Sequence, residues 1–105
     1  MLSIKINFVI PLNDINLLVF FENGVIKKFD VKNLIHNYPQ YKALEDINLF
    51  NSVKVDIGGC GVSWNEDLDC SEYQIWRDGI DIPLNIDDFN NFIKFYNVNI
   101  KDKEI

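Results

Sequence analysis

The feature that most constrains this chain is a hairpin pattern in the middle of the sequence. Apolar Val53, Val55 and Ile57 alternate with polar residues, which is the period of a strand with one buried and one solvated face. The glycine-rich segment 58–61 follows, and glycine readily adopts the positive φ angles that a tight reversal requires. Residues 62–64 then supply the returning strand. We therefore expect an antiparallel hairpin, with Ile57 on its buried face.

The first part of the chain adds three further strand signals. Residues 4–10 alternate between apolar and mostly polar side chains, and Pro11 is expected to end this strand because it lacks a backbone donor. Residues 15–21 are almost continuously apolar, as in a central strand covered on both faces. The Asn-Gly pair at 23–24 predicts a type I′ turn, which leads into a strand over residues 25–29.

Three short helices are predicted in the segments between and after these strands. Asp30 is placed to cap a helical turn, and Pro39 is placed to begin a second short helix that continues toward residue 46. Ser71 begins a Ser-x-x-Gln pattern that is typical of a helix N-terminus. This pattern predicts a third helix from Ser71 to Trp76.

A fourth, amphipathic helix is predicted in residues 80–100, which we expect to form a C-terminal extension. Its apolar residues recur at i, i+3, i+4 and i+7, at Phe89, Phe92, Ile93 and Tyr96. An isolated helix of this length is marginal in water, so the apolar stripe must be buried. We expect it to cover the chain's own sheet in a monomer, and burial against a second copy in a homodimer is the alternative. Residues 101–105 form a charged tail.

Together these elements predict one α+β domain over residues 1–105. Its twisted antiparallel sheet is built from hairpins and is covered by the short helices and the C-terminal helix. The N-terminus lacks the basic segment and the small-residue cleavage site of a signal peptide. No apolar run reaches the roughly 20 residues that span a bilayer. We therefore expect a soluble, cytoplasmic protein that does not bind membranes.

Net charge restricts the partners that this chain can have. The 16 acidic and 10 basic residues give a formal charge of −6, which repels nucleic-acid phosphates and anionic lipids. Arg77 is the only arginine, and the only adjacent basic pair is Lys27-Lys28, so direct nucleic-acid binding is not expected. An acidic chain is suited instead to a basic protein partner, or to imitating nucleic acid.

The order of these signals resembles a small bacterial family, domain of unknown function family 2442. The resemblance covers roughly residues 2–79 and is carried by Pro11, Asp14, the run 17–21, Asn23-Gly24, Phe29-Asp30, Leu44, Phe50, Val53, Val55, the segment 58–64, Leu68 and Tyr73. Asn65 departs from the pattern, because such sequences often place a proline directly after the tryptophan. The resemblance implies a compact α+β domain. Some relatives resemble the partner half of two-gene toxin-antitoxin modules, which implies a protein-binding role.

Candidate catalytic and metal sites are incomplete in this sequence. Cys60 lies between glycines like an exposed nucleophile, but His36 is the only histidine, and the turn already explains the glycines. Two cysteines and one histidine are too few for a zinc site, and the acidic loop lacks the glycine and glutamate of a calcium loop. We therefore expect no catalytic residue, cofactor or metal. A small enzyme that uses Cys60 or the carboxylates of the 65–72 loop is the alternative.

The remaining candidate is a partner surface in which aromatic side chains are surrounded by carboxylates. Its residues are Trp64, Glu66, Asp67, Asp69, Glu72, Tyr73 and Trp76. Aromatic residues are enriched at interfaces, but large aromatics are also highly buried on average, so a core role for both tryptophans is the competing interpretation. We expect a non-enzymatic protein-interaction domain that acts as an acidic partner or antitoxin-like inhibitor of a basic protein. A nucleic-acid-mimicking inhibitor from a mobile element is a further alternative.

Overall fold

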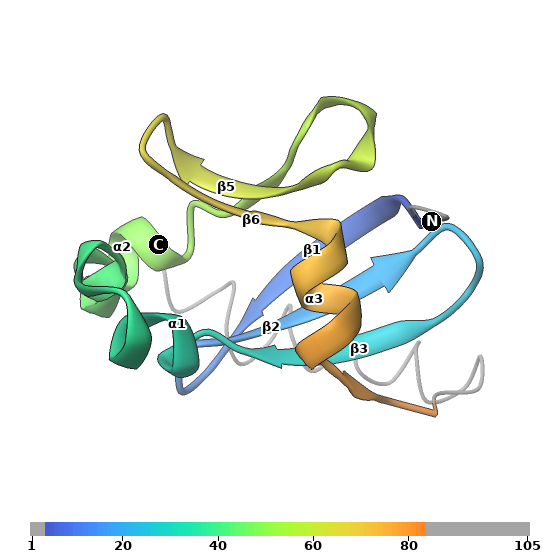
Figure 1. Ribbon diagram of the computed structural model, residues 1–105, viewed down its shortest axis with the longest axis horizontal. Coiled ribbons are helices and arrows are strands. Elements are labelled where there is room, and N and C mark those ends of the chain that lie inside the picture. The colour runs from blue at the N-terminus through green and yellow to red at the C-terminus, as the bar shows by residue number, and fades with distance from the viewer. Residues whose placement is uncertain (1–3, 84–105) are drawn as a thin grey trace.

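The computed structural model describes residues 4–83, and these residues form two antiparallel sheets with short helices (Figure 1). The strands are β1 (Ile6–Leu12), β2 (Asn16–Phe21), β3 (Ile26–Asp30), β4 (Lys54–Val55), β5 (Gly61–Asn65), β6 (Leu68–Ser71) and β7 (Ile80–Asp81). The α-helices are α1 (Lys32–Asn37), α2 (Ile47–Phe50) and α3 (Glu72–Asp78), and the 3-10 helices are η1 (Pro39–Glu45) and η2 (Ile57–Gly59). The predicted α+β class is confirmed. The predicted C-terminal helix lies outside the described residues.

The first sheet has the strand order β1-β2-β3-β7, and all neighbouring strands are antiparallel. β2 is central, as its apolar sequence predicts, and its residues Leu17 and Val19 are fully buried. The predicted end of the first strand at Pro11 is wrong, because Pro11 lies inside β1 opposite Leu17. β1 is an edge strand of this sheet, and an edge tolerates a residue that has no N–H group.

A register shift in β1 changes which of its side chains face the core. Ile6 pairs with Phe21 and Phe8 pairs with Phe20, so one residue of β1, Asn7, is inserted between two consecutive pairs. This insertion reverses the alternation along the strand. Phe8, which the alternation places on the same face as Ile6, is therefore 45% exposed while Ile6 is buried.

The turn between β2 and β3 contains the predicted Asn-Gly pair in a different geometry. A type I′ turn needs positive φ at both residues, but only Gly24, with φ of 89°, has it. The Gly24 N–H donates to the Phe21 carbonyl at 3.0 Å, and the Phe21 N–H donates to the Val25 carbonyl at 2.9 Å. These bonds describe a type I turn followed by a left-handed glycine, which is another common hairpin connection.

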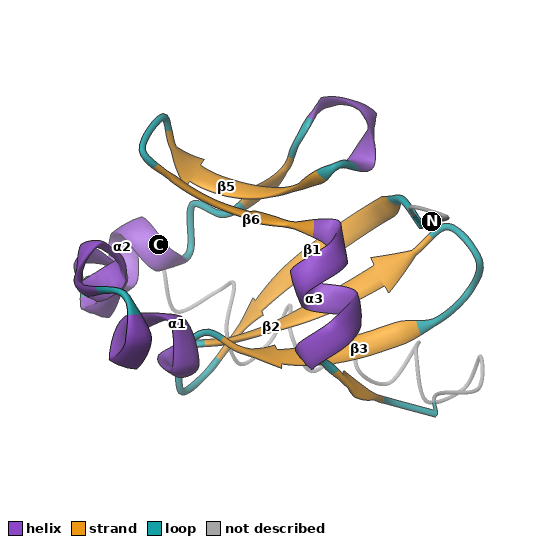
Figure 2. Ribbon diagram, in the orientation of Figure 1, coloured by secondary structure: helices purple, strands orange, loops and turns teal. Residues whose placement is uncertain are grey.

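The second sheet has the order β4-β5-β6 and lies beside the first as a separate layer (Figures 1 and 2). The predicted hairpin is confirmed, since β4 and β5 pair antiparallel, but β4 has only two residues. The predicted burial of Ile57 is wrong, because Ile57 lies in η2 and is fully exposed. β6 is an additional strand, in which buried Leu68 and Cys70 alternate with exposed Asp69 and Ser71.

The core lies between the two sheets and is closed by the helices (Figure 2). α3 contacts β3, β5 and β6, and its start is confirmed because the Ser71 hydroxyl accepts the Gln74 N–H at 3.2 Å. The Asp30 carboxylate accepts the Lys32 N–H at 2.9 Å at the start of α1, and Pro39 begins η1 as predicted. None of the helices within residues 4–83 has the length and apolar composition that crossing a membrane requires.

Candidate functional site

Trp64 belongs to the core and is therefore not part of the predicted partner surface. It is 5% exposed, and its indole N–H donates to the Phe50 carbonyl at 3.1 Å. The two rings also stack, with centroids 6.4 Å apart. This is the core role that the size of the tryptophan favours, so Trp64 cannot contact a partner in this fold.

Trp76 is half-buried and attaches α3 to the first sheet. Its ring meets Phe21 edge-on, with centroids 5.1 Å apart, and the Lys27 ammonium lies 4.6 Å from the ring centroid. Lys27 is in turn bound by Asp81 of β7 at 2.7 Å. These contacts give Trp76 a structural role at the junction of α3, β3 and β7.

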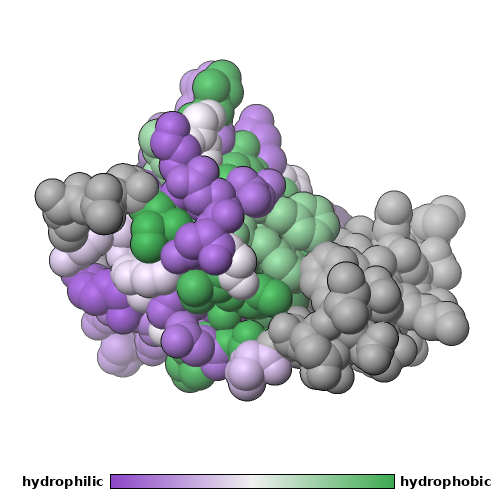
Figure 3. All heavy atoms as spheres, turned by 90° about the vertical axis from the view of Figure 1, so that its right-hand side faces the viewer, coloured by the Kyte–Doolittle hydropathy of each residue, from purple (hydrophilic) through white to green (hydrophobic). Residues whose placement is uncertain are grey.

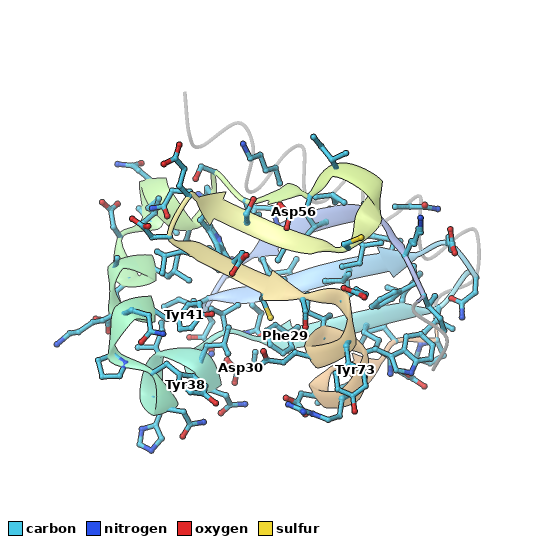
Figure 4. All side chains as sticks on the ribbon, turned by 45° about the horizontal axis from the view of Figure 1, so that its top comes forward. Phe29, Asp30, Tyr38, Tyr41, Asp56 and Tyr73 are labelled. Atoms are coloured by element: carbon cyan, nitrogen blue, oxygen red, sulfur yellow. The ribbon has the colours of Figure 1, made fainter. Side chains whose placement is uncertain are left out.

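The outer face of the second sheet gathers most of the remaining predicted residues. Ser63 pairs with Lys54 on one side and with Asp69 on the other, so their side chains form a row on the face that points away from the core. The Ser63 hydroxyl donates to the Asp56 carboxylate at 2.6 Å, which places Asp56 on the same face (Figure 4). Asp56 is an addition to the predicted surface.

An open hollow of about 670 Å³ lies on this face. Its lining residues are Lys54, Val55, Asp56, Ile57, Ser63, Asn65 and Glu66. The tight turn between β5 and β6 positions one wall, because the Asn65 side-chain oxygen accepts the Asp67 N–H at 2.9 Å. The hollow therefore combines two carboxylates, one ammonium group, polar uncharged groups and the aliphatic side chain of Ile57, whereas the Val55 side chain packs against the core.

We call the exposed or half-buried carboxylates of this sheet the acidic outer face, which comprises Asp56, Glu66, Asp67 and Asp69. None of the four forms an ion pair with another residue of the described segment 4–83. The ion pairs of that segment lie elsewhere and join Lys27 to Asp81, Lys32 to Asp14 and Asp30, and Arg77 to Asp78. The acidic outer face therefore presents negative charge to solvent, with Lys54 as its basic neighbour.

Glu72 and Tyr73 lie at the start of α3, directly after β6 in the chain. The Glu72 N–H donates to the Cys60 carbonyl at 3.3 Å, which links α3 to the segment that follows η2. Tyr73 is exposed, and the Arg77 guanidinium lies 5.6 Å from its ring centroid. Asp78 pairs with Arg77 at 2.8 Å, and this hydrogen bond lowers the pKa of the Asp78 carboxyl group. Tyr73 thus lies next to a basic side chain, and neither Glu72 nor Tyr73 is part of the hollow on the outer face.

The structure does not bring Cys60 and His36 together. Cys60 follows η2 and is exposed, whereas His36 is exposed on α1 at the opposite end of the molecule (Figures 1 and 2). Nucleophilic catalysis needs the base within hydrogen-bond reach of the thiol, so these two residues do not form a catalytic pair. Cys70 is buried, and burial raises its pKa to about 12, which keeps it a neutral thiol. Both cysteines are free.

Metal-binding groups are similarly dispersed. In the part of the chain that the structure describes, no three His, Cys, Asp or Glu side chains are placed to hold one metal ion. The acidic carboxylates face solvent on a strand, a turn and a loop, and do not converge on a point.

A second cavity, of about 280 Å³, lies between α1 and α3 over the end of β3. Phe29 and Leu34 contribute its apolar lining, and Asn37, Tyr38 and Gln74 contribute polar groups. Its charged residues are already engaged, as the ion pairs of α1 and α3 show. The sequence did not predict this cavity because its walls come from segments that are far apart in the chain.

The comparison with known proteins gives a family without an assigned activity. Residues 6–81 match the model of a family described as "Protein of unknown function (DUF2442)". The matched segment begins at the first residue of β1 and ends at the last residue of β7, so it includes both sheets. No curated protein and no solved structure matches the chain.

Proposed function

Because this chain belongs to the family Protein of unknown function (DUF2442), whose description assigns no activity, we propose a function from its surface. The protein is a non-enzymatic interaction domain that binds a basic partner protein through the acidic outer face. The observation that carries the proposal is the set of solvent-facing carboxylates on β6, the β5–β6 turn and the residue after β4. They have no ion-pair partner among residues 4–83.

Charge supports a basic protein over other partners. The whole chain has a formal charge of −6, so its field attracts cationic surfaces and repels nucleic acids and anionic membranes. β6 and the hydrogen-bonded segments beside it hold Asp69, Asp67 and Asp56 in place, which favours a folded partner with a complementary basic surface. Binding there covers the partner's basic surface, so the chain acts as an inhibitor or a stoichiometric subunit, as an antitoxin does for its toxin.

The shape of the face also suits protein binding. The hollow of about 670 Å³ is open and combines charged and aliphatic walls, as expected for a contact surface that receives side chains of a partner. By comparison, the cavity between α1 and α3 has charged groups that are already paired within the chain.

The test begins with capture on the immobilised full chain from a lysate of its native host at low salt. Retained proteins are identified by mass spectrometry, and each is then purified and titrated against the chain by calorimetry at several salt concentrations. We expect one basic protein whose affinity falls as salt rises, because the contact is electrostatic. Displacement of a bound nucleic acid from that protein would identify nucleic-acid mimicry as its mode of inhibition.

Two double variants with equal charge change separate the acidic outer face from net charge. Glu66→Lys with Asp69→Lys reverses two charges of the face, whereas Glu22→Lys with Glu45→Lys reverses two exposed charges elsewhere. We expect the first pair to weaken binding about 100-fold and the second to weaken it only a few fold. Equal losses from both pairs, or no basic protein retained by the wild type, would overturn the proposal.

A further inference from the structure

We propose that Ile57 is an apolar anchor that enters a pocket of the basic partner protein while the acidic outer face makes the charged contacts. This inference rests on the proposed function and adds the hydrophobic half of the same contact. It commits to one occupant, a basic protein whose surface has an apolar pocket beside its positive charges.

Exposure singles out Ile57 among the apolar residues of the described segment. It is 100% exposed, whereas the other large exposed hydrophobic side chains of that segment lie between 45% and 69%. Single surface hydrophobes are common and need no function. Ile57 differs from them because a closely packed backbone loop places it in solvent.

Glycine geometry fixes the backbone of the loop that carries Ile57. Gly58 and Gly59, which follow Ile57 in η2, have φ angles of 79° and 73°. A Cβ on Gly59 would lie 2.7 Å from the Ile6 carbonyl oxygen, and one on Gly61 would lie 2.4 Å from the Cys70 carbonyl oxygen. The loop is therefore packed closely against the backbones of β1 and β6, in a conformation that only glycine adopts there without strain.

Hydrogen bonds close the loop on both sides of Ile57. The Gly59 N–H donates to the Asp56 carbonyl at 2.9 Å, and the Asp56 N–H donates to the Gly61 carbonyl at 2.9 Å. The Asp56 carboxylate is also held by Ser63 at 2.6 Å. Ile57 has a β-branched side chain with a restricted χ1, so it loses less conformational entropy on binding than a long flexible side chain would.

The surroundings of Ile57 match an interface in which an apolar contact is bordered by charge. Ile57 and Val55 line the same hollow as the carboxylates of Asp56 and Glu66. Figure 3 shows the side of the molecule that lies on the right in Figure 1, where hydrophobic residues (green) lie among hydrophilic residues (purple). Binding energy at interfaces concentrates in a few buried side chains that a polar rim surrounds.

A basic protein fits this surface better than a second copy of the chain. An isologous dimer through the outer face would bring the same carboxylates of both copies together. Like charges in that arrangement repel, whereas a cationic surface would neutralise them. Charge complementarity therefore favours a basic protein over a second copy of the chain.

The experiment compares Ile57→Ser with Ile47→Ser in the full chain. Ile47 is 57% exposed on α2, is not among the residues that line the hollow, and serves as the matched control. Both variants should unfold at the wild-type urea midpoint, because neither side chain is buried. With the basic protein identified by capture, we expect Ile57→Ser to weaken binding about 10- to 100-fold and Ile47→Ser to change it less than about 2-fold.

A photo-crosslinker locates the pocket directly. The full chain with p-benzoylphenylalanine at position 57 is irradiated in the host lysate, and the crosslinked peptide is sequenced. Crosslinks to an apolar segment of the same basic protein support the inference. If the charge-reversal variants lose binding while Ile57→Ser keeps it, the anchor is refuted and the proposed function stands. If the wild type binds no basic protein, both the anchor and the proposed function are refuted. If the wild type is a dimer that Ile57→Ser dissociates, the site binds a second copy of the chain and the anchor in a basic protein is refuted.

Discussion

Replacing Gly59 by alanine should destabilise the protein far more than the same change at Gly58. Both glycines have positive φ angles, so an alanine at either position carries a conformational cost of about 1–2 kcal/mol. Their surroundings differ. A Cβ at Gly58 would meet nothing closer than the Cys60 sulfur at 3.7 Å, an ordinary contact, whereas a Cβ at Gly59 would lie 2.7 Å from the Ile6 carbonyl oxygen.

The difference between the two variants isolates the steric part. The atom opposite Gly59 belongs to the backbone of β1, which is an edge strand of the first sheet and cannot rotate away as a side chain would. Overpacking of this kind costs about 1–3 kcal/mol beyond the conformational term. We therefore expect a loss of unfolding free energy of about 1–2 kcal/mol for Gly58→Ala and about 2–5 kcal/mol for Gly59→Ala.

Urea unfolding followed by circular dichroism measures both values in the full chain. Tryptophan fluorescence gives a second probe, because Trp64 is buried between the sheets and reports the loss of the core. Coincident transitions from the two probes justify a two-state free energy. Equal losses for Gly58→Ala and Gly59→Ala, within about 0.5 kcal/mol, would refute the claim that η2 is packed against β1.

Three further predictions concern the core and the start of α3. Trp64→Phe removes the hydrogen bond to the Phe50 carbonyl and some volume, and should lower the unfolding free energy by about 2 kcal/mol; no change would contradict the core role of this tryptophan. Ser71→Ala removes the cap of α3 and should cost about 1 kcal/mol, whereas Ser71→Gly should cost only a few tenths. Burial raises the pKa of Cys70 to about 12, so above about pH 8.5 the unfolded chain releases the thiol proton while the native state keeps it. Stability should therefore fall with rising pH by at most about 1.4 kcal/mol per unit from this residue, and Cys70→Ala should remove that part of the fall. A Cys70→Ala profile parallel to that of the wild type would contradict the shift.

The sequence correctly predicts the parts of this fold that depend on residues close together in the chain. The apolar run of β2, the Pro39 helix start and the Ser71 cap all depend on residues within a few positions of each other, and the structure confirms them. The predictions that were wrong concern features that depend on the sheet as a whole. Pro11 stays in β1 because that strand lies at an edge, and the sequence of β1 alone does not show its position in the sheet.

The candidate site shows the same limit of sequence-based prediction, because Trp64 and Ile57 have the opposite burial to the one first considered for each. The enrichment of aromatic residues at interfaces made Trp64 a candidate for the surface although its size favoured the core, and alternation made Ile57 a candidate for the core. Instead Trp64 is 5% exposed and Ile57 is fully exposed. Alternation correctly pairs β4 with β5, but it does not report where pairing stops. Pairing stops before Ile57 because the left-handed glycines of η2 turn the backbone out of the strand.

The glycines that end β4 also explain why an exposed isoleucine lies beside the acidic outer face. An isoleucine buried in a continued strand would contribute about 1.5–3 kcal/mol to folding, and this chain holds Ile57 in solvent instead. The conformational cost of the loop is small only because glycine occupies its positive-φ positions. An arrangement that keeps an aliphatic side chain in solvent, beside carboxylates that have no ion-pair partner among residues 4–83, forgoes that contribution to the stability of the isolated chain. It becomes favourable when a partner buries the isoleucine and neutralises the charges, and this argument connects the fold of η2 to the proposed function.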